Sequence, residues 1–389
     1  MSEPFRAGII GTGFMGGVHA HAVRASGGVV SRIASSSHDR ASAAVGLLRA
    51  EHAAASAEEL VRADDVDAVH ICTPNASHAR LAELALAAGK HVICEKPLAT
   101  TVEDARRLVA AAGASGRITA VPFVYRYYAT VREARARIAS GAAGQLQLLH
   151  GSYLQDWLAG SEDTNWRVDA EVGGPSRAFA DIGVHWCDLL EFTTGHRITS
   201  LTARLFRAFE RRGVADGGTG AAVGTEDGAH VIFETDRGAT GSVVVSQVSL
   251  GRKNRLWFSF DGEAEAYRFD QELPESLWIG GRSANRLQLR DRETLSSAAR
   301  PYAVLPAGHP QGYQDCFNAF VADFYATVAG RPQDGLPTFA DGLRAASITA
   351  AVLESAGSGR WVDVGRWHTP AGPQATRPAT DETHLQGRS

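Results

Sequence analysis

The alternation of short apolar runs with helical patterns in residues 5–123 limits the fold more than any other feature of the sequence. Strands that alternate with helices predict a parallel sheet with helices on both faces. We therefore predict a doubly wound α/β domain, a Rossmann-type sheet, over residues 1–125. The expected strands are 5–10, 29–34, 66–73, 91–94 and 118–123, and the expected helices are 15–26, 40–49, 77–88 and 101–112.

The pattern changes after residue 125, where strand-like runs follow one another with short turns. Such runs predict a large open, mostly antiparallel sheet, so we expect an α+β domain over residues 126–365. The expected strands are 146–154, 198–209, 230–234, 240–248, 256–260, 264–269 and, at an edge, 361–364. The expected helices are 130–140, 181–193, 312–329 and 339–356. Residues 366–389 are polar and contain three prolines, and we expect them to be a disordered tail.

The composition is that of an ordinary globular protein. A net charge of −4 over 389 residues argues against broad nucleic-acid binding, and 44% hydrophobic residues argue against wholesale disorder. The N-terminus shows no signal peptide and no run is long enough to span a membrane. None of the four cysteines forms a C-x-x-C pair, so we expect reduced thiols, a cytoplasmic location and no zinc site.

Residues 11–16 read Gly-Thr-Gly-Phe-Met-Gly, a G-x-G-x-x-G motif between the first strand and the first helix. Gly11 would allow the tight turn, Gly13 the close approach of a pyrophosphate, and Gly16 close packing of helix on strand. The free N–H groups at the helix start, including those of Phe14 and Met15, favour an anion. The motif alone is weak, but its setting predicts a dinucleotide site.

The choice between NAD and NADP stays open at this stage. An acidic residue at the end of the second strand would hold a ribose hydroxyl and repel a 2′-phosphate, but this position holds Ser35. Ser36, His38 and Arg40 could donate hydrogen bonds to a phosphate. This arrangement permits NADP without requiring it.

Two further groups of residues are candidates for a catalytic role. Lys96 follows the strand 91–94, at a strand end where ligands of such sheets bind, although a lone lysine there is more often a solvated charge. Asp181 and His185 stand four residues apart, so a helix would place a carboxylate beside an imidazole. The plainer interpretation is a helix-capping Asp with a core His, and a metal site would need a third ligand that we cannot place.

Several polar and aromatic residues are candidates for binding a substrate. Arg126 follows a strand and could bind hydroxyls or pair with a carboxylate. A second segment combines rings, which stack on sugar C–H surfaces, with groups that bind hydroxyls, although a packed surface loop is an equal alternative. Its candidate residues are Tyr153, Gln155, Asp156, Trp166 and Arg167.

Four motifs together resemble the glucose–fructose oxidoreductase/inositol dehydrogenase (Gfo/Idh/MocA) family over residues 5–365. They are Gly11–Gly16, Cys72-Thr-Pro-Asn75 with His78, Glu95-Lys96-Pro97, and Asp181-x-x-x-His185. The resemblance implies hydride transfer between a sugar or cyclitol and NAD(P). It implies Lys96, Asp181 and His185 as the catalytic residues, and it adds Thr73, Pro74, Asn75, His78, Glu95 and Lys96 to the cofactor contacts.

Within the family, the aromatic segment resembles the branch of levoglucosan and glucoside 3-dehydrogenases, which implies oxidation of a pyranose hydroxyl, at C3 in our preferred interpretation. An inositol dehydrogenase and a keto-sugar reductase remain alternatives, as do a non-catalytic dinucleotide sensor and an NAD-dependent lyase or hydrolase. The family also implies a homo-oligomer, a dimer or tetramer, formed through the large sheet.

Overall fold

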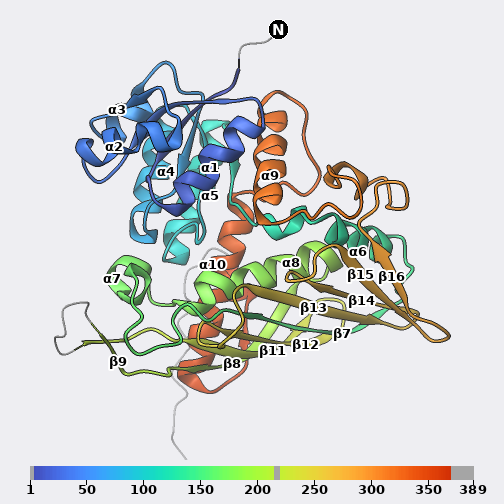
Figure 1. Ribbon diagram of the computed structural model, residues 1–389. Coiled ribbons are helices and arrows are strands. Elements are labelled where there is room, and N and C mark those ends of the chain that lie inside the picture. Colours follow the sequence, from blue (N-terminus) through green and yellow to red (C-terminus); the bar gives the residue numbers. More distant parts are fainter. Residues whose placement is uncertain (1–3, 214–219, 369–389) are drawn as a thin grey trace, which may run out of the picture.

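The computed structural model describes residues 4–213 and 220–368 (Figure 1). Its first part is a six-stranded, wholly parallel sheet in the order β3-β2-β1-β4-β5-β6. The strands are β1 (Arg6–Ile10), β2 (Val29–Ala34), β3 (His52–Ala53), β4 (Ala68–Ile71), β5 (His91–Cys94) and β6 (Thr119–Ala120). The helices are α1 (Phe14–Ala25), α2 (His38–Leu48), α3 (Ala57–Arg62), α4 (His78–Ala87) and α5 (Val102–Ser115).

This part confirms the predicted doubly wound sheet. The apolar runs form its centre, where all four residues of β4 are buried, and serine or threonine side chains cap three of the helices. Ser37, Ser56 and Thr101 each accept a hydrogen bond from a backbone N–H of the first turn. Two short elements, β3 and α3, were not predicted, because neither has enough residues to show a period.

The second part is a nine-stranded sheet in the order β16-β15-β14-β13-β7-β12-β11-β8-β17. Only the central pair, β7 with β12, is parallel, so the prediction of a mostly antiparallel sheet is confirmed. The strands are β7 (Leu146–Leu154), β8 (Ile198–Phe206), β11 (Gly228–Thr235), β12 (Thr240–Ser246), β13 (Arg255–Gly262), β14 (Glu265–Asp270), β15 (Ser276–Gly281), β16 (Arg286–Leu289) and β17 (Val362–Asp363). A separate short ribbon pairs β9 (Arg211–Arg212) with β10 (Ala221–Ala222).

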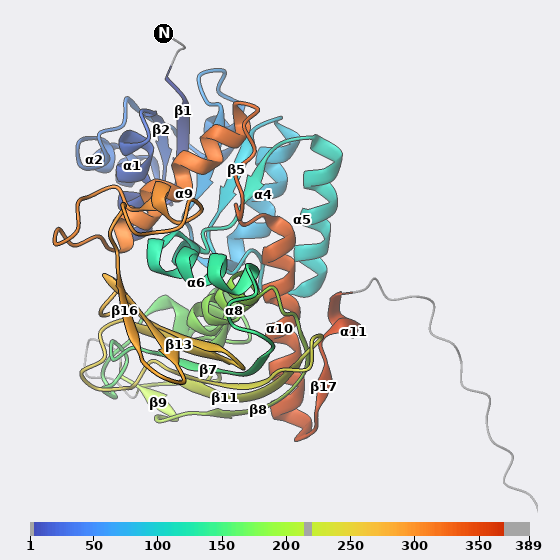
Figure 2. The same cartoon turned by 90° about the vertical axis from the view of Figure 1, so that its right-hand side faces the viewer.

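Helices α6 (Ala129–Ala139) and α8 (Val184–Thr194) lie between this sheet and the parallel-sheet domain (Figure 1). Before α8 come a π-helical segment (Phe179–Gly183) and the one-turn helix α7 (Ala170–Gly173). One face of the large sheet is thus covered, while no helix of the described residues covers the other face (Figure 2). The outer face carries the partly exposed side chains of Leu148, Ile232 and Val244.

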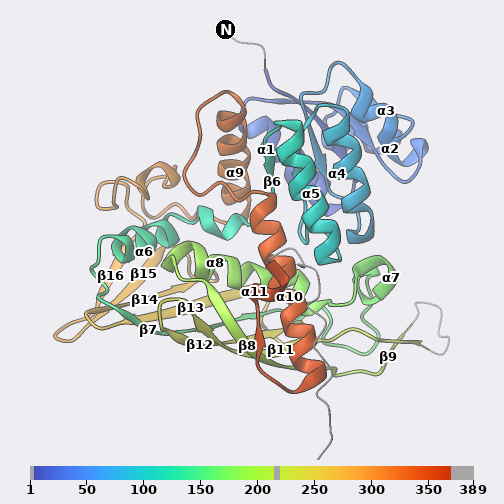
Figure 3. The same ribbon diagram turned by 180° about the vertical axis from the view of Figure 1, so that it is seen from behind.

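The two long helices near the C-terminus join the two parts. Helix α9 (Tyr313–Val328) packs against α1, and α10 (Phe339–Ser358) packs against both α5 and β8 (Figure 3). Chain beyond residue 125 therefore completes the packing of the first domain, and the exact boundary near 125 stays a prediction. The short helix α11 (Gly365–His368) occupies the start of the predicted tail, which is therefore ordered up to residue 368; residues 369–389 lie outside the described residues.

Two further observations concern the whole described chain. Within residues 4–213 and 220–368 every helix is too short or too polar to cross a membrane. All four cysteines are free thiols, and three of them are buried.

Candidate active site

The three glycines of the loop between β1 and α1 differ in the space that surrounds the position of a side chain. Gly11 has φ of 106°, and a side chain on it would come within 2.5 Å of the carbonyl oxygen of Cys72. A side chain on Gly16 would come within 2.2 Å of the carbonyl oxygen of Gly11. Gly13 faces open space instead, with no described atom within 4 Å of its missing Cβ. Two glycines thus keep the turn tight, and the third leaves the backbone accessible.

The start of α1 is suited to an anion. Its N-cap is Gly13, which offers no capping side chain, and its first turn contains no acidic residue. The side chain of Phe14 is 78% exposed beside this helix end. Uncapped N–H groups at the positive end of a twelve-residue helix favour a negatively charged group. The loop therefore fits the pyrophosphate of a dinucleotide on the evidence of its own geometry.

The end of β2 presents hydroxyl and guanidinium groups. Ser35 Oγ lies 3.0 Å from Thr12 Oγ1, and Arg40 Nη1 donates to Ser36 Oγ at 3.3 Å. The side chains of Ser36 and Arg40 are exposed. Positions 35 and 36 hold serines and not Asp or Glu. These two positions therefore lack the carboxylate that would repel a 2′-phosphate.

Two residues expected at the cofactor are engaged within the protein through their side chains. Asn75 Nδ2 donates to the carbonyl oxygen of Gly173 at 2.8 Å. The buried ring of His78 lies between the carbonyl oxygens of Pro97 and Thr73, each 2.8 Å from a ring nitrogen. These two side chains hold the shape of the loop, and the cofactor contacts expected from residues 73–75 and 78 stay a prediction.

Glu95 is buried and belongs to a chain of polar groups inside the first domain. Its carboxylate contacts His19 Nε2 at 3.0 Å, and the other oxygen accepts from the backbone N–H of Lys96 at 3.1 Å. His19 Nδ1 lies 3.0 Å from His70 Nδ1, and His70 Nε2 lies 3.2 Å from the hydroxyl of Tyr325. This network ties α1, β4, β5 and α9 together beneath Lys96. It gives the Glu95 side chain a positioning role beside Lys96, and a contact of Glu95 with the cofactor stays a prediction.

The structure brings Lys96 and Asp181 together. Lys96 Nζ lies 2.6 Å from Asp181 Oδ1 and also donates to the Asp181 carbonyl oxygen at 3.1 Å. Arg167 Nε is 3.3 Å from the same carboxylate oxygen, and Gln247 Nε2 donates to Oδ2 at 2.9 Å. Although burial alone raises the pKa of the Asp181 carboxyl, Lys96 and Arg167 outweigh it and hold that pKa well below its usual range. Asp181 is therefore a carboxylate that orients the ammonium group.

Asp181 lies on a π-helical turn that leads directly into α8. A side chain on Gly183 would come within 2.5 Å of the Phe179 ring, so this wide turn packs a ring against a glycine. Turns of this kind occur often at functional sites, where they re-aim side chains. The predicted helix is present, but its first turn is wider than an α-helical turn.

His185, in the first turn of α8, is buried among aromatic rings. Its ring centroid is 5.1 Å from that of Tyr125, 5.7 Å from Phe123 and 6.3 Å from Tyr153. Its Nδ1 is buried and has no hydrogen-bond partner in the described structure. Burial, and secondarily the charge of Lys96, hold the pKa of His185 well below its ordinary value. The imidazole is therefore neutral near pH 7 and can accept a proton.

A polar cluster adjoins this ring. The hydroxyl of Tyr125 contacts that of Tyr153, which donates to Asn254 Oδ1 at 2.7 Å. Gln155 Nε2 donates to the same amide oxygen at 2.8 Å. Burial raises the pKa of Tyr125 to about 12, so both hydroxyls keep their protons at neutral pH. These groups place hydrogen-bonding atoms next to His185.

Two of the expected substrate residues have other partners. The Arg126 guanidinium is buried and pairs with Asp188 and with Asp341, the latter at 2.8 Å. The structure shows the alternative of a carboxylate pair, and a contact of Arg126 with substrate hydroxyls stays a prediction. Asp156 Oδ2 accepts from Lys253 Nζ at 2.7 Å and from the Gly251 N–H at 3.0 Å, so it holds a loop.

Gln247 and Asn254 are site residues that the sequence analysis missed. Gln247 directly follows β12, whose parallel partner β7 ends at Leu154, next to Gln155. Carboxyl ends of parallel strands meet at one edge, so this pair delivers residues to the same place. The missing signal was the parallel pairing, because the sequence suggested only antiparallel neighbours there.

Comparison with known proteins gives two family matches. Residues 5–123 match a family described as an oxidoreductase family with an NAD-binding Rossmann fold, and residues 131–268 match a GFO/IDH/MocA C-terminal domain. Levoglucosan dehydrogenase from Pseudarthrobacter phenanthrenivorans is 30% identical, covering 93% of this chain and 98% of its own length. Inositol 2-dehydrogenase 3 from Saccharopolyspora erythraea is 28% identical over 92% of this chain and 95% of its own.

A solved structure agrees with these matches. That of levoglucosan dehydrogenase in complex with NADH and L-sorbose superposes with a TM-score of 0.86 at 29% identity, covering 93% of this chain and 99% of the other.

Proposed function

The chain belongs to the Gfo/Idh/MocA family of NAD-binding oxidoreductases, and from this we propose that it is a dehydrogenase that oxidises a secondary hydroxyl of a sugar or cyclitol. The single observation that carries the proposal is the Lys96–Asp181 contact beside a buried, neutral His185. A non-catalytic dinucleotide sensor would need the glycine loop but not this arrangement.

In the proposed reaction each of the three residues has one task. A bound nicotinamide supplies the hydride acceptor. His185 takes the hydroxyl proton, since its imidazole is neutral. Lys96 donates a hydrogen bond to the reacting oxygen and stabilises its developing negative charge. Asp181, itself held by Gln247 and Arg167, orients the ammonium group of Lys96.

We place the substrate among pyranose sugars or glycosides, with oxidation at C3 as the preferred position. Two features support a polyhydroxylated ring: the aromatic rings around His185, and the amides of Gln155 and Asn254 with the Tyr153 hydroxyl. The similar levoglucosan dehydrogenase supports a pyranose, and the similar inositol dehydrogenase supports a cyclitol as the second candidate. Use of the same site for reduction of a keto-sugar remains part of the proposal, because the groups work in both directions.

We propose that the dinucleotide is NAD and that NADP is also accepted. Relatives with bound NADH support NAD. Ser36 and Arg40, with no carboxylate at Ser35, support tolerance of a 2′-phosphate. Replacing Arg40 by Glu should raise the KM for NADP and leave that for NAD nearly unchanged. Equal effects on both would show that Arg40 does not face the ribose.

The decisive experiment assays a panel of monosaccharides, glycosides and inositols with NAD and NADP, following cofactor reduction. With the substrate and cofactor that show activity, His185→Ala should lower kcat by about 10²–10⁴-fold while the cofactor still binds. The acid limb of kcat/KM should lie below pH 6.5, because the pKa of His185 is lowered and the base works only when neutral.

Two results would count against the proposal. Near-normal turnover of the His185→Ala variant would remove the residue from the mechanism. Binding of the cofactor without reduction by any member of the panel would favour the sensor or the NAD-dependent lyase or hydrolase.

We also propose that a second copy of the chain covers the outer face of the large sheet. Leu148, Ile232 and Val244 are 42%, 51% and 37% exposed on neighbouring strands of that face. Size-exclusion chromatography with light scattering should show a dimer or tetramer, and a monomer at assay concentration would contradict the proposal.

A further inference from the structure

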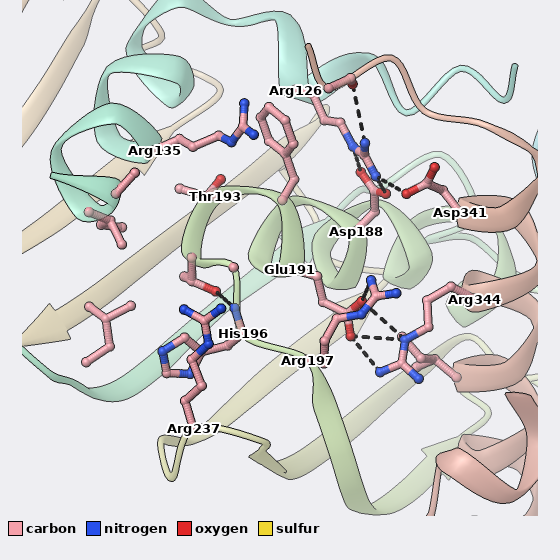
Figure 4. Close-up of a pocket in the computed structure, with 18 of the residues that line it drawn as sticks. Arg126, Arg135, Asp188, Glu191, Thr193, His196, Arg197, Arg237, Asp341 and Arg344 are labelled. Atoms are coloured by element: carbon pink, nitrogen blue, oxygen red, sulfur yellow. Dashed lines mark hydrogen bonds and ion pairs between the residues drawn. The ribbon is translucent and has the colours of Figure 1, made fainter. Parts of the chain in front are cut away.

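A cavity of about 680 Å³ opens between α6, α8 and α10 (Figure 4). Lys96, Asp181 and His185 do not line it, and the proposed reaction uses none of its residues. The cavity lies along α8 beyond His185, toward the end of that helix at Thr194. Its lining therefore needs an explanation of its own.

The lining carries more positive than negative charge. Five arginines contribute to it against three carboxylates, and the carboxylates already have partners. Glu191 is shared by Arg344 at 2.6 Å and Arg197 at 2.7 Å, as Figure 4 shows. Asp188 and Asp341 both hold Arg126. No lining carboxylate remains for a further cation.

Arg135 pairs with Asp334, which lies outside the lining, so Arg237 supplies the charge that remains without a partner. It is exposed at the cavity, and no carboxylate of the described residues lies within ion-pair distance of it. Its guanidinium nitrogens pass 3.5 and 3.6 Å from the place where a side chain on Gly195 would begin, directly after α8. The negative end of α8 attracts cations, but it is equivalent to only about half a charge. The helix end alone therefore does not balance the excess.

Thr193 gives an independent sign of a missing partner. The residue is only 1% exposed, it lines the same cavity, and its hydroxyl has no hydrogen-bond partner in the described structure. Buried hydroxyl groups are nearly always hydrogen-bonded, because leaving one unpaired costs free energy. A polar molecule in the cavity would supply the partner.

We propose that this cavity binds a small oxyanion, a phosphate monoester or a carboxylate, through Arg237 and with the help of Thr193. Guanidinium groups match both anions through paired N–H donors. Because α8 also carries His185, a bound anion would contact the helix that holds the proposed base. The site is thus placed to bind an anionic effector distinct from the neutral sugar.

The test is calorimetric titration of the full chain with inorganic phosphate and, separately, with citrate, in saturating NADH so that the glycine loop is filled. One saturable site should appear for at least one anion, and the stronger arm identifies the chemistry. Arg237→Gln should weaken that binding roughly tenfold, and Thr193→Val should weaken it several-fold without changing the shape of the residue. The matched control is Arg282→Gln, an exposed arginine outside the cavity, which should bind like the parent protein.

Two outcomes would overturn the proposal. One is the lack of saturable binding of either anion to the parent protein. The other is binding that neither Arg237→Gln nor Thr193→Val weakens, which would place the anion elsewhere. Unfolding curves of both variants should match the parent, so that a loss of binding cannot be confused with loss of the fold.

Discussion

The carboxylate of Asp181 depends on a residue far from it in sequence. Gln247 is fully buried and donates to Asp181 Oδ2, while Lys96 and Arg167 approach Oδ1. If the amide were lost, the carboxylate could rotate, and Lys96 would no longer be held in one place. Gln247 is therefore a positioning residue, and it acts through Asp181.

We expect Gln247→Leu to lower kcat by roughly 10–100-fold, the range for a hydrogen bond to a charged group of about 1.5–3 kcal/mol. The KM for the cofactor should change little, because Gln247 touches no part of the glycine loop. Steady-state kinetics with a sugar substrate checks this. Equal losses in kcat and cofactor affinity would instead indicate a general disturbance of the fold.

At the level of single residues, motifs in the sequence indicated candidate residues but did not indicate the partners that hold them. Motifs singled out Lys96, Asp181 and His185 as candidates, and the structure brings Lys96 and Asp181 into contact near His185. The carboxylate partners of Arg126 could not be named from the sequence, because one of them, Asp341, is 215 residues away, and no local pattern reports such a pair.

Among the elements, the loop and first turn of α1 offer a matched pair of glycines. A side chain on Gly16 would collide with the carbonyl oxygen of Gly11, whereas one on Gly17 would meet nothing within 4 Å. Both glycines lie in the same helix. One is required by packing and the other is not.

We expect Gly16→Ala to lower the free energy of unfolding by about 1–3 kcal/mol and to weaken NAD binding, because the collision displaces the loop. Gly17→Ala should leave NAD binding intact and stabilise the helix by about 0.5–1 kcal/mol. Urea unfolding and a fluorescence titration with NAD distinguish the two variants. Similar behaviour of both would show that the close approach at Gly16 does not matter.

The elements that periodicity could not predict are those whose geometry depends on distant contacts. The π-helical turn is stabilised by the Phe179 ring over Gly183, and a pattern of apolar spacing does not distinguish it from an α-helix. The short strands β15 and β16 exist because they pair with β14 and with each other at the sheet edge. Long elements such as β7 and α10 were predicted almost to the residue, since each repeats its period several times.

For the molecule as a whole, buried histidines make stability depend on pH. Burial holds the pKa of His70 and that of His185 well below 6.5 in the folded protein. In the unfolded chain both regain ordinary values, so below pH 6.5 the unfolded state binds more protons. The free energy of unfolding must then fall as the pH is lowered. The stabilisation that comes from the neutral histidines is fully present above pH 6.5.

We expect a slope of about 1.4 kcal/mol per pH unit from each of these histidines below pH 6. His70→Gln removes one titrating group but keeps polar atoms for His19 and Tyr325, so its slope should be smaller by about that amount. Urea unfolding at several pH values between 7.5 and 5 tests this. Parallel curves for the parent and the variant would show that His70 does not titrate on unfolding.

The place of β7 at the centre of the large sheet has a consequence for how a new chain folds. Its two neighbours, β12 and β13, begin at Thr240 and Arg255, so neither has been synthesised when β7 leaves the ribosome. Until they arrive, both edges of β7 lack hydrogen-bond partners and are open to strands of other nascent chains. Pairing between such distant segments is slow. Slower synthesis at lower temperature, or added chaperones, should therefore raise the yield of folded protein.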